Sequence, residues 1–381
     1  MTPRLPITQL TAAAALLLAS TAPARADLFA TDKFALYGDT RVRAETDWNS
    51  QDPNGVPRDD RTRLRARLRI GFRFDPSEHW QVGARVRSGS EESQQSPHIT
   101  LVDLDDNDTG DASFNFDRWY LRGQAGGFEA WAGRNNLPYW KQDDMLFDDD
   151  VTMIGIAGQW SGDAGPGTLT FAGGVFSPPV GMRVTSGSAA GAQVVWQPEL
   201  AGVRWAFAAG IHDFDSNSDD PDAAGLLDGN GSRDYRLLAA SVQARFDAGG
   251  RALVLGGDVL HNIEDYEDDD PDPFTAENFD QVDGYIALAT WGSLDERGDW
   301  LVGWYHARIQ TFAVYNSYAQ DDWVRWGTAT QARASNMKGD EVRFGWAFGP
   351  KMNLIARLYI VEAITTVEDG MRLRVDFNYE L

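Results

Sequence analysis

Polar and apolar residues alternate with a period of two over long stretches of this chain. Segment 61–74 is the clearest case, with apolar residues at its even positions from 64 onward and arginines at most odd positions, Arg61, Arg63, Arg65, Arg67, Arg69 and Arg73. Successive side chains of a β-strand point to opposite faces, whereas a helix would spread these arginines around its axis. Residues 371–381 repeat the pattern. The alternation predicts strands with one apolar face and one polar face.

About 16 segments carry this pattern, and most are near the roughly 9–11 residues of a tilted membrane strand. They lie at 33–46, 61–74, 79–89, 113–124, 127–134, 151–160, 168–177, 189–197, 203–213, 234–246, 251–261, 281–292, 300–311, 339–348, 352–362 and 371–381. Short turns at 75–78, 125–127, 198–202, 247–250 and 349–351 alternate with long polar loops such as 47–60, 90–112, 214–233, 262–280 and 312–338.

This alternation of connections is typical of outer-membrane barrels, which have tight periplasmic turns and long extracellular loops. We therefore expect an all-β fold, an antiparallel transmembrane β-barrel of about 16 strands that closes so that hydrocarbon meets no unpaired strand edge. A barrel of about 18 strands is the alternative if 312–338 forms one more hairpin. An even number of strands places both termini in the periplasm.

The first 26 residues have the layout of a secretory signal peptide. Arg4 precedes an apolar stretch at 10–19, and the small-residue site Ala24-Arg25-Ala26 follows it. The stretch is about half as long as the roughly 20 residues of a membrane-spanning helix. We expect residues 1–26 to be removed, leaving 27–381 as a single barrel domain in the outer membrane of a Gram-negative cell, without a separate plug domain.

The formal net charge of −23 and the absence of cysteine exclude several classes of protein. An excess of carboxylates repels phosphate backbones, so no nucleic acid partner is expected. Without cysteine there is no disulfide framework, thiolate chemistry or Cys-bound zinc. The histidines lie on different predicted strands and loops, and no Gly-x-Ser-x-Gly or His-x-x-x-His motif is present, so we do not expect an enzyme. A triad assembled from distant segments stays an alternative.

Function in such a barrel depends on the side chains that face its interior, because barrels of about 16 to 18 strands leave an aqueous channel. An arginine facing lipid costs roughly 2–4 kcal/mol at the midplane, so the arginines are expected to face the channel. Those of the first four strands and of the last strand form a predicted basic wall of the pore: Arg41, Arg43, Arg63, Arg65, Arg67, Arg69, Arg85, Arg87, Arg118, Arg122, Arg372 and Arg374. Alternatively, they pair with lumen carboxylates and fill space.

The third long loop, 135–150, combines acidic residues with the aromatic residues Tyr139, Trp140 and Phe147. This composition suggests a loop that folds into the mouth of the barrel. Its aspartates are candidates for a constriction: Asp143, Asp144, Asp148, Asp149 and Asp150. Carboxylates facing the basic wall would set up a field across a narrow passage, which selects solutes by charge. An outward-facing arrangement of these aspartates is the alternative.

Two acidic runs offer hard oxygen ligands that Ca²⁺ prefers. They are 264–272 and the cluster Asp213, Asp215, Asp219, Asp220 and Asp222. Neither has the spacing of an EF-hand loop. Solvated surface loops are therefore the favoured interpretation, and we expect no cofactor or metal.

Several motifs resemble those of the bacterial putative porin family of outer-membrane channels. They are the arginine-rich strand 63–72, Phe116-Asp-Arg-Trp-Tyr-Leu121, Gly133-Arg-Asn-Asn-Leu-Pro138, and Leu146-Phe-Asp-Asp-Asp-Val151 with Gly155. The resemblance implies a porin for passive diffusion of small hydrophilic, charged solutes, a homotrimer or a monomer, embedded among outer-membrane lipid and lipopolysaccharide. Such barrels usually end in phenylalanine, which the barrel-assembly machinery recognises, whereas this chain ends in Leu381.

The arginine-rich second strand is also similar to the alginate-exporter family. This resemblance is weaker, because Asn135 follows Gly133-Arg134 where that family has a Gly-Arg-Gln motif. On this alternative the chain is a substrate-specific channel or exporter for an anionic polysaccharide, and the arginines form its binding surface.

Overall fold

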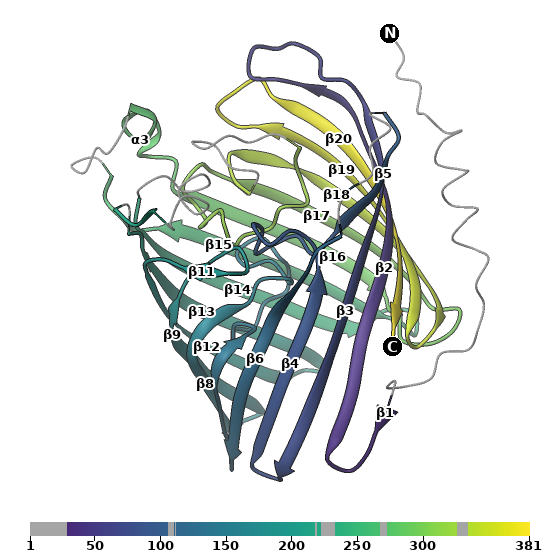
Figure 1. Ribbon diagram of the computed structural model, residues 1–381, viewed down its shortest axis with the longest axis vertical. Helices are drawn as coiled ribbons and strands as arrows, with labels where there is room; N and C mark the ends of the chain where they lie inside the picture. Colours follow the sequence, from purple (N-terminus) through teal and green to yellow (C-terminus); the bar gives the residue numbers. More distant parts are fainter. Residues whose placement is uncertain are drawn as a thin grey trace.

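The computed structural model describes residues 29–105, 110, 112–217, 219–221, 233–266, 273–325 and 334–381. These residues form 16 long strands that make one antiparallel barrel. In chain order the strands are β2 (Phe34–Gln51), β3 (Arg61–Ser77), β4 (Trp80–Ser88), β6 (Phe114–Ala125), β7 (Phe128–Asn135), β8 (Met153–Ala164), β9 (Gly167–Ser177), β12 (Ser188–Leu200), β13 (Val203–Asp215), β14 (Tyr235–Asp247), β15 (Ala252–Asn262), β16 (Asp283–Gly292), β17 (Trp300–Ile309), β18 (Met337–Gly349), β19 (Met352–Ala363) and β20 (Asp369–Glu380). Each pairs with the next, and β20 pairs with β2, so the sheet closes on itself (Figure 1).

Short elements in the described residues add to this barrel. A two-residue strand, β1 (Phe29–Ala30), pairs with β2, and β5 (Ile99–Asp103) pairs with β3 near the long-loop end. The connection after β9 contains a small hairpin of β10 (Pro179–Val180) and β11 (Val184–Thr185). One helical turn, α3 (Pro273–Asn278), precedes β16.

The predicted antiparallel barrel is confirmed, and every predicted segment corresponds to one of the long strands. Several strands run further toward the long loops than the pattern indicated. β2, for example, reaches Gln51, whereas its alternation ends near residue 46. Beyond the lipid band a strand no longer needs an apolar outer face, so the pattern marks only the part of each strand that meets the membrane.

The alternative of about 18 strands is wrong for the part of 312–338 that the structure describes before β18. Residues 312–325 form turns and coil, and residues 311–320 are all buried. The aromatic residues Phe312, Tyr315 and Tyr318 are no more than 2% exposed. This loop therefore hides its apolar side chains inside the barrel and does not present them to lipid. Residues 326–333 lie outside the described residues.

Short and long connections gather at opposite ends of the barrel (Figure 1). Strands β6 and β7 are joined by two residues at one end, whereas β4 and β6 are joined by residues 89–113 at the other. β1 and the C-terminal Leu381 lie at the short-turn end, where the Leu381 backbone N–H donates to the Gly38 carbonyl. That this end faces the periplasm stays a prediction.

Large apolar side chains cover the outside of the barrel. The exposed ones include Trp80, Phe114, Phe116, Trp119, Phe128, Ile156, Phe171, Val175, Val259 and Trp346. An apolar band of this kind with interfacial aromatics is what a barrel presents to hydrocarbon. Among the helices of the described residues, none is long and apolar enough to span a membrane.

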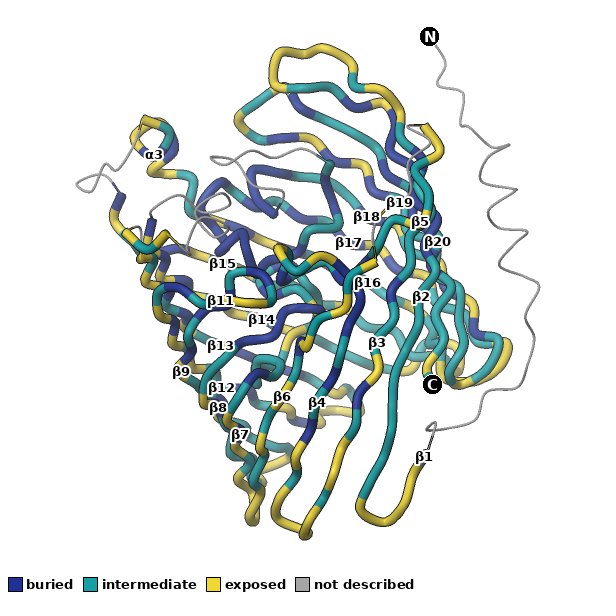
Figure 2. Tube along the Cα trace, viewed as in Figure 1, coloured by how far each residue is buried: buried dark blue, intermediate teal, exposed yellow. Residues whose placement is uncertain are grey.

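The hydrophobic core lies inside the barrel, toward the long-loop end. Figure 2 shows buried segments gathered there, where connecting loops fold inward. Met145 and Phe147 come from loop 135–152, and Val314 and Tyr318 come from loop 310–325. Both loops pack against the inner faces of β7 to β19 and so narrow the interior.

Candidate pore and constriction

Opposite charges alternate where the first and last long strands close the barrel. β20 pairs with β2 in a register that sets Arg43 opposite Asp376 and Glu45 opposite Arg374. Arg43 Nε lies 2.6 Å from Asp376 Oδ1, and Arg374 Nε lies 2.6 Å from Glu45 Oε2. All four residues are at most 2% exposed. Close, charge-assisted contacts of this kind offset the cost of removing the charges from water.

The arginines of β3 also meet carboxylates inside the barrel. Arg67 and Arg69 both contact Asp39, at 2.8 and 2.7 Å. Arg65 lies 3.9 Å from Glu45 and also donates to Ser96 and to a loop carbonyl. The structure therefore brings most of the predicted basic wall together on three neighbouring strands, and the members on these strands are Arg41, Arg43, Arg63, Arg65, Arg67, Arg69, Arg372 and Arg374.

The other predicted arginines lie further along the wall and differ in their contacts. Arg85 pairs with buried Asp117 at 2.5 Å, next to Arg118, which makes no ion pair with any described residue. Arg87 is fully buried and donates to backbone carbonyls of residues 93 and 94, so it supports a loop. Arg122 pairs with Glu129 at 3.5 Å near the short turns, away from the group on β2, β3 and β20.

Loop 135–152 sends one aspartate onto the basic wall. Asp150 Oδ1 lies 2.5 Å from Arg69 and its Oδ2 lies 3.4 Å from Arg67. Burial alone would raise the pKa of Asp150, but Arg67 and Arg69 hold it below its usual value. Asp150 is thus an ionised carboxylate that ties the loop to β3.

A second inward loop, 310–325, also places an aspartate against the arginines of the basic wall. Asp322 contacts Arg374 and lies 3.6 Å from Arg43 and 3.8 Å from Arg357 on β19. Burial would raise the pKa of Asp322, but these arginines hold it well below its usual value. Asp322 was not among the predicted site residues, because it lies in a polar loop whose sequence gives no sign that it folds inward.

The remaining candidate aspartates have other partners. Lys141 pairs with Asp144 and Asp149, each at 2.7 Å, within the loop itself. Asp148 accepts from the Asp150 backbone N–H at 2.8 Å, which shapes the turn that holds Asp150. Asp143 lies beside Asp258 of β15, where the proximity of the two carboxylates raises the pKa of Asp143 in addition to its burial. Of the predicted aspartates, Asp150 alone makes ion pairs with the basic wall among the described residues.

A cavity of about 210 Å³, a candidate passage for solutes, lies between the two inward loops and the inner faces of β17 to β19. Its loop side carries acidic groups, including Asp144, Asp149 and Asp322. Its strand side carries Arg343 and Arg357, which both contact Glu341. This candidate passage therefore has mainly acidic groups on its loop side and two arginines on its strand side.

The arginines at this passage belong to β18 and β19, not to the strands where the basic wall was predicted. The sequence pattern indicated one of them, because Arg343 and Glu341 lie on the same, polar face of the predicted strand 339–348. Register places Arg357 opposite both Arg343 and Arg374, so the basic surface continues across the seam of the barrel. The sequence alone does not say which sector the loops leave open.

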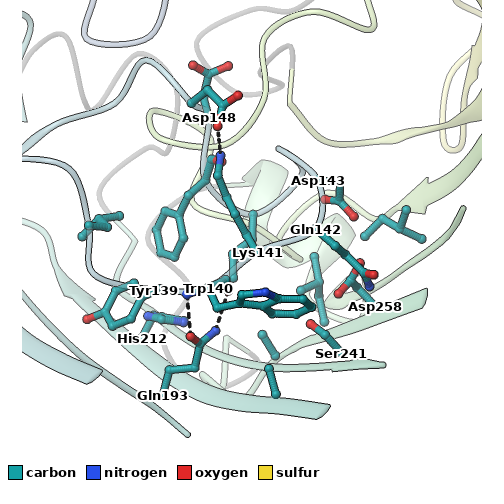
Figure 3. Close-up of a pocket in the computed structure, with 18 of the residues that line it drawn as sticks. Tyr139, Trp140, Lys141, Gln142, Asp143, Asp148, Gln193, His212, Ser241 and Asp258 are labelled. Atoms are coloured by element: carbon teal, nitrogen blue, oxygen red, sulfur yellow. Dashed lines mark hydrogen bonds and ion pairs between the residues drawn. The ribbon is translucent and has the colours of Figure 1, made fainter. Parts of the chain in front are cut away.

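A second cavity, of about 80 Å³, lies between loop 135–152 and the inner faces of β12 to β16. Figure 3 shows the Trp140 ring in its middle, with Tyr139 and His212 on one side and Asp143 and Asp258 on the other. These side chains come from the loop and from β13 and β15.

The acidic runs considered for Ca²⁺ form no metal site in the described part of the chain. No group of three or more His, Cys, Asp or Glu side chains there is arranged to hold a metal ion. Asp213 and Glu264 instead pair with Arg236 on the outside of the barrel, at 3.4 and 3.3 Å. Residues 222 and 267–272 lie outside the described residues.

Comparison with known proteins finds one similar family and solved structures of a similar fold. The model of the putative porin family matches residues 25–211, which confirms the resemblance. Among solved structures, Pseudomonas putida OprB at high pH is similar, with 12% identity, coverage of 92% of this chain and 94% of that chain, and a TM-score of 0.58. Salmonella typhi OmpF in complex with daunomycin is also similar, with 11% identity, coverage of 93% and 99%, and a TM-score of 0.52. At such identities the likeness concerns the fold. No curated protein matches the chain in sequence.

Proposed function

From the match of residues 25–211 to the putative porin family and the porin fold of the described chain, we propose that this protein is an outer-membrane porin. It gives passive diffusion of small hydrophilic, charged solutes through an aqueous pore lined by arginines. The family and the fold both point to a channel without catalytic activity.

The observation that carries the proposal is the passage between the inward loops and the strand wall. Its two sides bear opposite charges, with Asp144 and Asp149 facing Arg343 and Arg357 across about 210 Å³. Opposed charges in a narrow passage of low dielectric orient polar solutes and discriminate among them by charge. The passage is wide enough for several water-sized groups, since one water needs roughly 10–15 Å³ by this measure.

The strand wall carries more arginines than carboxylates, which favours anions over cations. Glu45, Asp47 and Asp376 each contact two or more arginines, so the carboxylates of β2 and β20 do not neutralise the wall. An excess of fixed positive charge raises the local concentration of anions.

We also propose how the protein reaches the outer membrane and which way it is oriented there. Residues 1–26 act as a signal peptide, although residues 1–28 lie outside the described residues. The short turns and both termini face the periplasm, and the long loops face outward among lipopolysaccharide. The barrel-assembly machinery inserts the chain, which works as a monomer or a homotrimer.

Single-channel recording tests this function directly. The refolded chain 27–381 is placed in a planar bilayer, and the reversal potential is read across a KCl gradient. We expect stable conductance steps with a preference for chloride. A cation preference would assign selectivity to the loop aspartates, and well-folded protein without conductance would reject the open porin.

Export of an anionic polysaccharide remains the second candidate, because arginines continue across β3, β2, β20 and β19. Against it, Asp150 and Asp322 occupy arginines that a polyanion would need. Long, high-affinity blocks of current by oligouronates at micromolar concentration would favour this candidate over a general porin.

A further inference from the structure

The cavity beneath loop 135–152 has walls that are fixed by specific contacts. The Trp140 backbone N–H donates to Gln193 Oε1 at 2.8 Å, and Gln193 Nε2 donates back to the Trp140 carbonyl at 2.8 Å (Figure 3). Tyr139 and Phe147 pack edge-on against His212, with ring centroids 4.6 and 5.0 Å apart. The loop is therefore held against β12 and β13, and the cavity is part of the folded structure.

Buried polar atoms in this cavity have no hydrogen-bond partner in the described chain. They are Asn136 Oδ1, Tyr139 Oη, Asp143 Oδ2 and His212 Nε2. His212 is only 2% exposed. Each of these atoms can accept a hydrogen bond, and leaving a buried acceptor unmatched costs about 1–3 kcal/mol. An occupant that donates hydrogen bonds would satisfy these atoms.

The cavity also holds two carboxyl groups, Asp143 and Asp258, that make no ion pair with any described residue. Asp143 lies beside Asp258, whose Oδ2 accepts a hydrogen bond from Gln142 Nε2 at 2.9 Å. The nearest cation of the loop, Lys141, is occupied by Asp144 and Asp149. Burial, and then Asp258, raise the pKa of Asp143, so this pair holds a proton when nothing else neutralises it.

We propose that this cavity is a binding site for small primary ammonium solutes that carry a second hydrogen-bond donor. The ammonium group lies between Asp143 and Asp258, the carbon chain packs along Trp140, and the second donor reaches His212. A cation next to an indole face gains further attraction. A divalent metal ion fits less well, because Ca²⁺ takes 6–8 oxygen ligands and the described residues offer no cluster of three.

The size of the cavity limits the solute. About 80 Å³ holds roughly five water-sized groups. A chain of five heavy atoms, such as protonated 3-amino-1-propanol, has this size and both donors. If the protein is a porin, small ammonium compounds are a class of solute that this site would bind. The inference rests on the proposed porin function only because the solute must reach the cavity from the lumen.

Isothermal titration calorimetry with 3-amino-1-propanol tests the site on the detergent-refolded full barrel. We expect saturable binding of this probe, no binding of 1,3-propanediol, which lacks the charge, and none of tetramethylammonium, which lacks N–H donors. Asp143→Asn and Asp258→Asn should each weaken binding about tenfold or more, since each removes one charged acceptor. The loop variant D143N leaves the strands unchanged, so it serves if D258N fails to fold.

Asp283→Asn is the matched control. Asp283 is an exposed carboxylate on the outside of β16 that pairs with His261 at 2.8 Å, so D283N removes one charge without touching the cavity. It should bind 3-amino-1-propanol as the wild type does. Equal binding of 1,3-propanediol, or unchanged binding in D143N and D258N, would overturn the site. No binding of any probe would mean that the cavity holds water only. Conductance without binding rejects this site alone, and binding without conductance rejects the porin alone.

Discussion

Asp322 is a loop carboxylate that forms ion pairs with arginines of the barrel wall. It contacts Arg374 and lies within 4 Å of Arg43 and Arg357, from three different strands. In Asp322→Asn these arginines lose a counter-charge, so chloride permeability relative to potassium should rise. Losing the ion pair between Asp322 and Arg374 should also lower the free energy of unfolding by about 1–3 kcal/mol.

Reversal potentials and thermal unfolding of D322N and the wild type check this prediction. Asp340→Asn is the control, because Asp340 pairs with His306 on the outside of β18. An unchanged chloride preference in D322N would show that the Asp322 cluster lies away from the ion path.

Asp144 gives the passage a pH dependence. Burial raises the pKa of Asp144 to about 6, although Lys141 acts in the opposite direction. A raised carboxyl pKa means that the group is neutral below about pH 6 and negative above it. The chloride preference should therefore increase as pH falls through about 6, with the change centred there.

Reversal potentials from pH 4.5 to 8 measure this effect. Asp144→Asn removes this carboxyl group and should make the transition near pH 6 smaller. A transition of the same size in D144N would assign the titration to another group.

At the scale of elements, loop 135–152 is held in the barrel by its aromatic contacts. Phe147 is 6% exposed and packs against Tyr139, His212 and Phe214. Phe147→Ala should weaken the docking of the loop by about 3–5 kcal/mol, the usual cost of removing a buried phenylalanine side chain. Because the barrel strands pair with one another and not with the loop, conductance should become larger and noisier while far-UV circular dichroism stays the same.

Single-channel recordings of F147A measure this change. Phe128→Ala is the matched control, since Phe128 is 64% exposed on the outer face of β7. A quiet, wild-type current from F147A would contradict the role of this docking.

The strands could be predicted from the sequence because each must present alternate residues to lipid, so the period of two is imposed by the surroundings. The inward loop 310–325 could not. Its aromatic residues, such as Tyr315 and Tyr318, are buried by contacts with Phe214 and other distant residues, which leave no local pattern. The sequence left open an additional hairpin within 312–338.

The candidate site was predictable in part for a related reason. The inward direction of the β3 arginines could be predicted, because they share the odd positions of an alternating strand. The register of β2, β3 and β20 then brings them together with the arginines of the neighbouring strands. Asp322 and Arg357 needed the folded structure, because one depends on the path of a loop and the other on the sector that the loops leave open.

In the whole molecule, carboxylates are concentrated in the loops and arginines on the barrel wall. The chain has a net charge of −23, yet the inner wall at β2, β3 and β20 is rich in arginine. Many of the chain's carboxylates lie in the sequences of the long connections, such as 214–233 and 262–280. Attraction and repulsion by these exposed charges should be screened as ionic strength rises, since the Debye length falls from about 10 Å at 0.1 M to about 3 Å at 1 M.

If ions cross the barrel through the passage beside Arg343 and Arg357, a chemical change at its lining should alter the current. The chain contains no cysteine, so a single introduced cysteine reports on one position. Arg343→Cys faces this passage, whereas Val342→Cys, at a position 47% exposed on the outer face of the same strand, is its matched control.

The deciding measurement is the single-channel current of each variant during reaction with a water-soluble methanethiosulfonate reagent. We predict that the current of R343C falls in discrete steps and that the current of V342C does not change. An unchanged current in R343C, with labelling verified by mass, would show that ions cross by another route.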